Sequence, residues 1–428
     1  MKKVMLPLAV AASAVLALSA CSGSGSDNTS AAGGDGASKH VSLTFWHGYT
    51  EADGKVLDQI VDDFNKSQDQ VTITDVTKTW ADIGDTLLTS LSAKTGPDLV
   101  ALPAENLPIY ASKGAFQKLD DFYDSDETKG ASLNEQAVSM EKVDGSYYGV
   151  PTGFVPLSVI YNKKLFAAAG ISAFPTTWDE WVADAKKLTK DADGDGTPEQ
   201  YGLALPDHAT VGNGVWPSLF YGGGGGLVDD SGHSVIDSDA NVKTLTYWAD
   251  AVRKDHISPT GLDGVKSDGL FSSGKAAMEI GGPWMAGVAA DNKIDYGIAG
   301  VPGGSAGPAA SAIGISAGVT VQADADQKAA AEKFFAYFFS QDVATKWSLG
   351  SGWPPLRTDI PASAVSSNPV VKALTGIAGT ARPLLPGVAN SVDVLAAVDE
   401  ATQKALTGGD PAELLKAASA TASQALSE

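Results

Sequence analysis

Cysteine is almost absent from this chain of 428 residues, in which Cys21 is the only one. A single thiol cannot form an internal disulfide, so the fold has to be stabilised by its core rather than by a covalent cross-link. Histidine is scarce as well, and the histidines are dispersed without the spacing of a metal-binding motif. The five of them are His40, His47, His208, His233 and His256.

Positive charge is also in short supply. The chain has 30 Lys and Arg residues against 51 Asp and Glu residues, which gives a formal net charge of −21. A surface this acidic repels the phosphates of nucleic acid and of anionic lipid. We therefore expect no nucleic-acid partner and no direct binding to anionic lipid. A phosphorylated ligand is disfavoured too, unless a local basic pocket overrides the average charge.

Long hydrophobic runs are confined to the start of the chain. Two lysines precede a mostly apolar stretch, Val4–Ala17, which is too short to span a bilayer as a mature helix. A Leu-Ser-Ala-Cys sequence then ends at Cys21 and resembles a bacterial lipobox, in which the thiol is acylated. We predict that residues 1–20 form a signal peptide and that Cys21 is lipidated. An ordinary signal peptide with an incidental cysteine is the alternative.

The segment that follows Cys21 carries no large apolar side chain. Residues 22–39 consist mainly of Ser, Gly, Ala, Asp, Asn and Thr, cannot bury a core, and are predicted to form a flexible tether with a reach of ~25 Å. The folded part is expected to begin at residue 40. The protein should therefore work in the cell envelope, held to the outer face of the cytoplasmic membrane by the lipid on residue 21.

Strand and helix patterns alternate from residue 41 to residue 102. Strands are predicted over residues 41–46, 71–76 and 98–102, and helices over residues 51–67 and 83–93. This order is typical of an α/β fold in which helices flank a mostly parallel sheet. Ligands bind such sheets at the carboxyl ends of the strands, where Trp46, His47, Glu105 and Asn106 are placed. The length of the chain after residue 20 indicates two domains.

The alternation resumes in the middle of the chain, where residues 147–162 have a strand pattern. Thr177 and Glu180 have the spacing of a capping box at the start of a helix. Four tryptophans are predicted to pack helices into the core, at positions 178, 181, 248 and 347. The other five tryptophans are candidates for ligand contact, with core packing as the alternative for each.

Two motifs resemble catalytic sequences but lack their context. Gly314–Gly318 matches a G-x-S-x-G nucleophile elbow, yet a strand pattern follows where a helix is required. Gly269–Ala276 resembles a P-loop, but Ala276 replaces the hydroxyl residue that holds magnesium. Neither motif predicts catalysis, and no carboxylate pair can be singled out for glycoside hydrolysis without its separation in space.

One acidic loop suggests calcium. Asp191, Asp193, Asp195 and Glu199 occupy positions 1, 3, 5 and 9 of an EF-like loop with Gly196 at position 6. The bidentate acid of position 12 is missing. Calcium is therefore predicted as an optional ion rather than a required cofactor, and a solvated acidic turn is the alternative.

Several short motifs, in order along the chain, resemble the extracellular solute-binding proteins of sugar ABC transporters, the group typified by maltose-binding protein. Each motif is weak alone, but together with the lipobox they cover nearly the whole sequence. They are Phe45-Trp46-His47, Gly149-Val-Pro151 with Tyr161-Asn162-Lys163, Pro175–Glu180, Phe271–Met278, Gly281–Trp284 and Gly352–Arg357.

The resemblance implies a two-lobed fold of the periplasmic-binding-protein type. Each lobe would hold a mostly parallel sheet flanked by helices, and hinge segments would join the lobes. Lobe one would comprise residues 40–151 and 300–350, and lobe two residues 152–299 and 351–428. A monomer would clamp its ligand between the lobes by a hinge motion and present it to a membrane permease. No catalytic residue is implied.

Carried over by position, the resemblance assigns ligand contacts to Trp46, His47, Glu105, Trp284, Trp353 and Arg357, and more loosely to Trp80 and Trp216. Asn106 is a ninth candidate, from its place after a strand at the same edge of the sheet. Such residues suit a sugar, because aromatic faces cover its C–H surfaces and polar groups pair its hydroxyls. The sequence thus favours a neutral oligosaccharide. Alternatives are a polyol, phosphodiester or polyamine on the same scaffold, or a secreted carbohydrate-active enzyme such as a glycosidase.

Overall fold

A computed structural model describes residues 40–427, with the exception of residues 51, 126–131, 208–213 and 230. The predicted signal peptide, Cys21 and tether lie outside the described residues. The strands are β1 Val41–His47, β2 Val71–Thr77, β3 Leu99–Pro103, β4 Lys142–Val143, β5 Ser146–Tyr147, β6 Val150–Pro156, β7 Ser158–Asn162, β8 Met278–Gly281, β9 Tyr296–Gly300, β10 Ala310–Val319 and β11 Ala381–Pro383.

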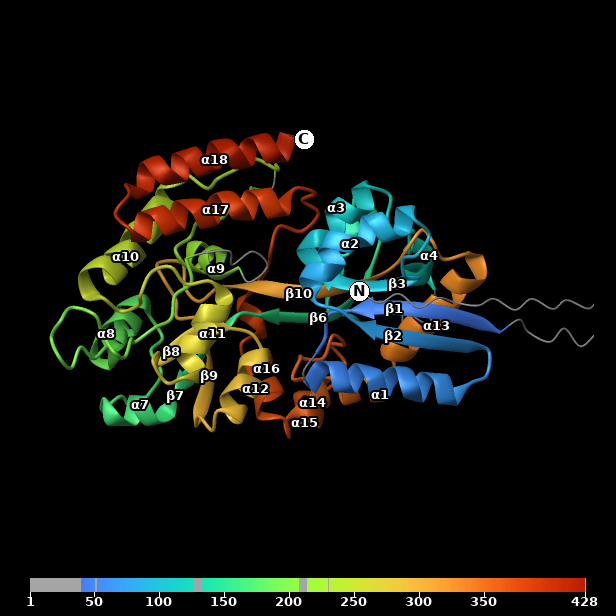
Figure 1. Ribbon diagram of the computed structural model, residues 1–428, viewed down its shortest axis with the longest axis horizontal. Helices are drawn as coiled ribbons and strands as arrows, with labels where there is room; N and C mark the ends of the chain where they lie inside the picture. Colours follow the sequence, from blue (N-terminus) through green and yellow to red (C-terminus); the bar gives the residue numbers. More distant parts are fainter. Residues whose placement is uncertain (1–39, 51, 126–131, 208–213, 230, 428) are drawn as a thin grey trace, which may run out of the picture. The chain divides into compact units, whose positions relative to one another are not determined.

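Helices connect and cover these strands (Figure 1). The α-helices are α1 Ala52–Ser67, α2 Trp80–Ser92, α3 Leu107–Ser112, α4 Asp120–Asp124, α6 Glu135–Ser139, α7 Lys163–Ala168, α8 Trp178–Leu188, α9 Val215–Gly222, α10 Asp239–Asp255, α11 Gly264–Ser272, α12 Trp284–Asp291, α13 Ala325–Phe338, α14 Gln341–Ser351, α15 Ala362–Val365, α16 Pro369–Gly376, α17 Ser391–Leu406 and α18 Pro411–Ser427. Two 3₁₀ helices are η1 Ala104–Asn106 and η2 Ala378–Thr380.

The larger sheet contains the alternating pattern predicted for residues 41–102. Its strand order is β11-β10-β3-β1-β2, and β6 also pairs with β10. Strand β1 runs parallel to β2 and β3, as expected when α1 and α2 act as crossover helices. Strand β10 runs antiparallel to β3 and β6, so the sheet is mixed rather than wholly parallel. Its carboxyl edge at β1 and β3 is the edge predicted to bind a ligand.

Alternate residues of these strands face different helices. Phe45 of β1 belongs to a core cluster with residues of α1 and α13, whereas its neighbour Trp46 belongs to one with Ile83 of α2 and Leu107 of α3. This is the period of two expected for a strand buried on both faces. Figure 1 shows α1 on one side of β1 and β2 and the pair α2 and α3 on the other.

The smaller sheet differs from the prediction of a mostly parallel sheet. Its order is β8-β7-β9, and both pairs are antiparallel. Strands β8 and β9 point the same way and are joined through α12, as in a parallel unit. Strand β7 lies between them in the opposite direction, because the chain reaches it directly from β6 through Leu157. The helix–strand alternation was visible in the sequence, but this inserted strand was not.

The chain from His40 to Glu428 forms one compact unit by its internal contacts. It passes from the larger sheet to the smaller one at Leu157 and returns between β9 and β10. These two crossings fall near the predicted lobe boundaries at residues 151 and 300. The boundaries themselves stay a prediction.

The structure confirms the predicted helix start at residue 177. The Thr177 side chain accepts a hydrogen bond from the Glu180 backbone N–H, and the Glu180 side chain accepts one from the Thr177 backbone. The four tryptophans assigned to the core are buried, with exposed fractions of 9% or less, at positions 178, 181, 248 and 347. Packing of these indoles accounts for most of the aromatic core around α8, α10 and α14.

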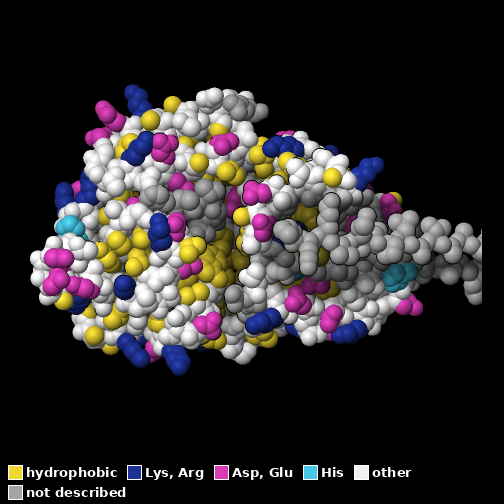
Figure 2. Space-filling view, viewed as in Figure 1, with side chains coloured by type: hydrophobic (Ala, Val, Ile, Leu, Met, Phe, Trp, Pro, Cys, Tyr) yellow, Lys and Arg dark blue, Asp and Glu magenta, His cyan; other side chains and the backbone are white. Residues whose placement is uncertain are grey.

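Neither catalytic-looking motif has the required context. Gly314–Gly318 lies inside β10, where Ser316 is fully buried and donates to Glu141 Oε1 at 2.8 Å. Gly269–Ala276 begins inside helix α11 rather than after a strand. Within the described part of the chain, no helix has the length and apolar character needed to cross a bilayer. On the face drawn in Figure 2, Lys and Arg side chains are scattered among Asp and Glu.

Candidate ligand-binding cavity

A cavity of about 930 Å³ opens at the carboxyl edge of the larger sheet. Gly48–Thr50 follow β1 and Pro103–Asn106 follow β3, so these two strand ends form one wall. Other walls come from α12, the first turn of α16, the middle of β10, and the segment from Leu349 to Trp353. Segments distant in sequence thus converge where the topology predicts a binding site.

Three of the five tryptophans predicted to contact a ligand line this cavity: Trp80, Trp284 and Trp353. Trp80 and Trp284 are half-buried, and Trp353 is buried. They come from the start of α2, the start of α12 and the chain just after α14. Three indoles around one cavity offer broad apolar faces to a ligand.

Each of these indoles packs against the backbone of a glycine. A Cβ atom added to Gly153 would lie 2.7 Å from the Trp353 ring, and one added to Gly48 or Gly282 would overlap the ring of Trp80 or Trp284. Any larger residue would have to displace the indole. The glycines therefore fix where the aromatic faces lie.

Polar side chains lie between the aromatic ones. Asp53, Lys55, Asn106, Asp291 and Asn368 line the cavity. The Asn368 side chain is hydrogen-bonded within the protein. Its Oδ1 accepts from two backbone N–H groups at the start of α16, and its Nδ2 donates to the Leu349 carbonyl at 2.9 Å.

Glu105 is the most buried acid of the cavity lining, with an exposed fraction of 4%. Burial raises the pKa of its carboxyl from 4.5 to about 7, and a backbone hydrogen bond offsets part of that rise. Near neutral pH the group is thus divided between its protonated and ionised forms. It can accept hydrogen bonds from hydroxyl groups in one form and donate one in the other.

Comparison with known proteins places this geometry in a family. Residues 59–373 match the family described as bacterial extracellular solute-binding protein. The chain belongs to this family. It is a family of binding proteins rather than of enzymes, and it accounts for a two-lobed α/β fold with a cavity at the sheet edge.

Individual relatives of this solute-binding protein cover nearly its whole length. The diacetylchitobiose binding protein DasA of Streptomyces coelicolor is 27% identical over 90% of this chain and 90% of its own. The galactooligosaccharide-binding protein of Bacillus subtilis is 25% identical over 90% of this chain and 89% of its own. The crystal structure of the cyclic alpha-maltosyl-1,6-maltose binding protein from Arthrobacter globiformis superposes with a TM-score of 0.77, at 26% identity, over 90% of this chain and 99% of that one.

Four residues predicted to bind ligand in this solute-binding protein are not among the described residues that line the cavity. Trp46 points to the α2 face of the sheet, where Lys78 Nζ lies 4.1 Å from the centre of its ring. Trp216 is fully buried, and its indole N–H donates to the Pro206 carbonyl at 2.9 Å. Both are core residues here, which was the stated alternative.

The other two lie elsewhere. His47 ends β1 with its ring fully buried beside α1. Arg357 lines a separate cavity of about 270 Å³, where its guanidinium donates to Asp359 and to the Phe339 carbonyl. Neighbouring side chains of a strand point to opposite faces of the sheet, so Trp46 faces α2 and His47 faces α1. Neither side chain faces the cavity, although both lie near the end of β1 in sequence.

Sequence reasoning missed other lining residues of this solute-binding protein. Tyr49 lies two residues after β1, so the same strand-end argument could have found it, whereas Asp53 and Lys55 lie in the first turn of α1. Asp291 ends α12 and Tyr296 begins β9, and no sequence signal marks them as cavity residues.

The acidic loop predicted to bind calcium brings three carboxylates together. One oxygen from each of Asp191, Asp193 and Asp195 lies within 4.8 Å of the others, and all three residues are exposed. Gly196 has a φ of +89°, the left-handed conformation that a glycine tolerates best. The fourth predicted ligand, Glu199, accepts a hydrogen bond from the Ala192 backbone at 2.8 Å. The arrangement has the hard oxygens that calcium prefers.

Proposed function

We propose that this protein captures a neutral oligosaccharide in the cavity and delivers it to the permease of an ABC importer. The observation that carries the proposal is the set of three glycine-backed indoles, Trp80, Trp284 and Trp353, around a space with polar groups between them. Sugar rings present apolar faces to indoles and hydroxyl groups to the polar side chains.

The size of the cavity agrees with this ligand class. Its ~930 Å³ lies at the upper end of the range for small-molecule sites, about 300–1,000 Å³. Several sugar rings fit more naturally than one, because a cavity of this volume lined by three indoles exceeds what a single ring needs. The names of the relatives, which bind diacetylchitobiose and galactooligosaccharides, support an oligosaccharide of about two to five units. We expect a Kd in the nanomolar to micromolar range, about −8 to −12 kcal/mol.

Delivery requires that the protein stay near its permease. We propose that acylated Cys21 anchors a monomer to the outer face of the cytoplasmic membrane and that residues 22–39 act as the tether. The lipobox-like sequence supports this step, and the extracellular family of the chain agrees with it. A permease would then recognise the ligand-bound form.

A polyamine is the strongest rival ligand. Asp53, Glu105 and Asp291 line the cavity against one lysine, Lys55, so its formal charge is negative. A polyamine would use the carboxylates and leave the indoles with a smaller role. We favour the sugar because three indoles line the cavity and the relatives named above bind oligosaccharides.

The deciding experiment compares ligand classes on the soluble fragment 22–428. A glycan array selects candidate oligosaccharides, and calorimetry then measures their Kd beside that of spermidine. Binding of a neutral oligosaccharide with spermidine inactive supports the proposal, whereas tight spermidine binding with no response to any glycan rejects it. Mass spectrometry after long incubation tests the enzyme alternative, since a binding protein leaves the sugar unchanged.

A further inference from the structure

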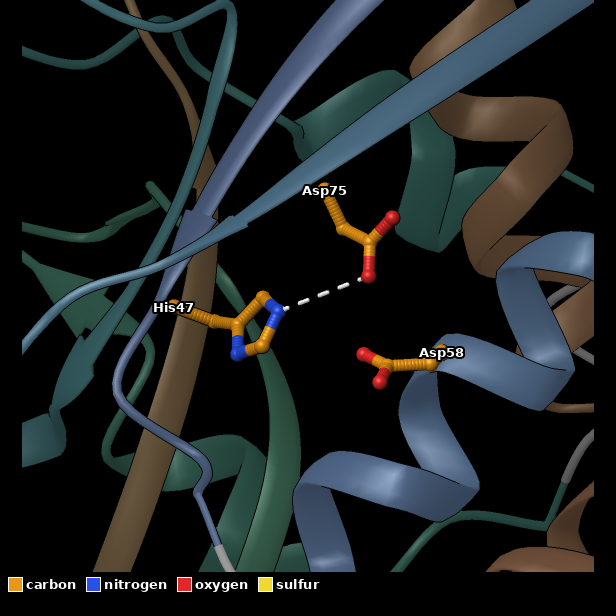
Figure 3. Close-up of side chains that lie close together, drawn as sticks. All are labelled: His47, Asp58 and Asp75. Carbon is orange, nitrogen blue, oxygen red and sulfur yellow. Dashed lines mark ion pairs between the residues drawn. The ribbon is translucent and has the colours of Figure 1, made fainter.

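Three side chains that play no part in the cavity converge between α1 and the larger sheet (Figure 3). His47 comes from the last position of β1, Asp75 from β2 and Asp58 from α1. One donor atom from each lies within 4.8 Å of the other two. In Figure 3, the two carboxylates and one ring nitrogen of the histidine point into the same space.

The histidine of this group is buried without a hydrogen bond. Its exposed fraction is 0%, and neither ring nitrogen has a hydrogen-bond partner among the described residues. Its Nε2 lies 3.8 Å from Asp75 Oδ2, which is within ion-pair distance but beyond hydrogen-bond length (Figure 3). The rings of Phe45 and Tyr49 lie 5.5 Å and 6.1 Å away, centre to centre. A buried imidazole with no hydrogen bond at either nitrogen requires an explanation.

The two carboxylates lie close together beside the imidazole. One oxygen from each of Asp58 and Asp75 lies within 4.8 Å of the other and of a ring nitrogen of His47. Two ionised carboxylates at such a separation repel each other, and a cation between them would offset that repulsion.

We propose that His47, Asp58 and Asp75 bind one divalent transition-metal ion, with Zn²⁺ as the best-fitting ion. The donor set is one imidazole nitrogen and two carboxylate oxygens, with water in any remaining position. Zinc bonds of about 2.0–2.2 Å place neighbouring tetrahedral ligands about 3.4 Å apart. The 3.8 Å between His47 and Asp75 needs a movement of only a few tenths of an ångström.

The carboxylate of Asp58, the third proposed ligand, can move further to reach the ion. Asp58 is exposed and can rotate about its side-chain bonds, whereas Asp75 is held on a strand. The nitrogen ligand argues against calcium and magnesium, which prefer oxygen. Bound metal would link α1 to β1 and β2, and so would stabilise this part of the fold.

The proposed site would not be visible from the spacing of the histidines in the sequence. The three ligands come from three elements and have no motif spacing, because the parallel register and the crossover helix α1 bring them together. In that register Asp75 lies opposite Phe45, two residues before His47 and on the same face of the sheet.

The test measures the response to zinc of the soluble fragment 22–428, held in excess calcium so that the Asp191–Asp195 loop does not compete. We expect one Zn²⁺ per chain by calorimetry. At a zinc concentration ~100-fold above Kd, the melting temperature should rise by about 3 °C. Asp58→Asn and Asp75→Asn should each weaken zinc binding at least about tenfold.

Asp62→Asn is the matched control, since Asp62 lies one turn further along α1, is exposed and pairs with Lys66 at 3.3 Å. It should respond to zinc as the wild type does. Asp58 is itself exposed, so its variant should fold even where a change at the buried histidine does not. A wild-type protein unaffected by zinc, or an Asp58→Asn variant with the full zinc response, overturns the proposal. Neither outcome depends on the proposed sugar function.

Discussion

At the scale of single residues, replacing a tryptophan of the cavity should lower ligand affinity, whereas replacing a tryptophan of the core should lower stability. We predict that Trp284→Ala and Trp353→Ala each weaken oligosaccharide binding by at least ~1–2 kcal/mol, because each removes a buried aromatic anchor of the ligand. Trp178→Ala should instead lower the melting temperature and leave the affinity intact, because this indole packs against Tyr247 and Trp248 at the start of α8.

Calorimetry on folded variants, together with thermal unfolding of each, separates the two effects. Should the variants at positions 284 and 353 lose stability yet keep their affinity, as expected of position 178, the assignment of the cavity would be wrong. The stacking argument for a sugar would fall with it.

Glu105 provides a second test at the same scale, through pH. The carboxyl has a pKa of about 7 in the folded protein, against about 4.5 when the chain is unfolded. Between these values the folded state holds a proton that the unfolded state has lost, so stability is greatest below pH ~4.5 and falls as the pH rises to about 7. The 2.5-unit difference corresponds to a loss on the order of 3 kcal/mol.

Glu105→Gln should remove this component of the pH dependence. Chemical unfolding of the wild type and the variant at pH 5 and pH 8 gives the change in the free energy of unfolding between the two pH values for each protein. Subtracting one change from the other cancels the contribution of other buried acids such as Glu141 and Glu279. Equal pH dependence in the two proteins would show that Glu105 is not buried as the structure describes.

At the scale of elements, the sequence predicts what depends on local pattern and misses what depends on tertiary packing. Strands β1 to β3 with α1 and α2 follow from hydrophobic period, and the start of α8 follows from its capping box. The antiparallel position of β7 between β8 and β9 could not be predicted, because the residues of β7 do not indicate which strands pair with it.

The candidate site shows the same division. Trp80, Trp284 and Trp353 were found from residue type and from the family resemblance. The glycines beneath them could not be found, since Gly153 and Trp353 meet only in the folded chain. Trp216 had the same residue type but is enclosed by the core, and only burial distinguishes it from the cavity indoles.

The acidic loop after α8 gives a prediction for one element. If calcium occupies Asp191, Asp193 and Asp195, a chelator should lower the melting temperature of calcium-loaded protein, since an ion that binds only the native state stabilises it. Affinity for the oligosaccharide should not change, because these residues do not line the cavity.

Asp193→Asn should abolish the effect of the chelator. Asp69→Asn, which removes an exposed acid outside the loop, should not. Identical melting curves with and without chelator, from calcium-loaded wild type, would exclude a structural calcium ion.

At the scale of the whole molecule, the acidic surface and the predicted anchor have complementary roles. With 51 acidic against 30 basic residues, the chain is not attracted to an anionic membrane surface by charge. The proposed retention near a permease would therefore depend on the predicted lipid rather than on charge. A single acyl chain binds a bilayer only weakly, so stable retention would need more than one chain on the anchoring residue.

Cys21 is the only residue of the chain that can carry such a thiol-linked lipid. We predict that Cys21→Ser abolishes acylation and either releases the protein into the medium or leaves it unprocessed. Ser22→Ala, at the neighbouring position, should remain acylated and membrane-bound. Metabolic labelling with a fatty acid, followed by cell fractionation, measures both outcomes. Label retained by Cys21→Ser would refute the anchor. The fold of the variant should be unchanged, because no second cysteine exists that could depend on Cys21 as a disulfide partner.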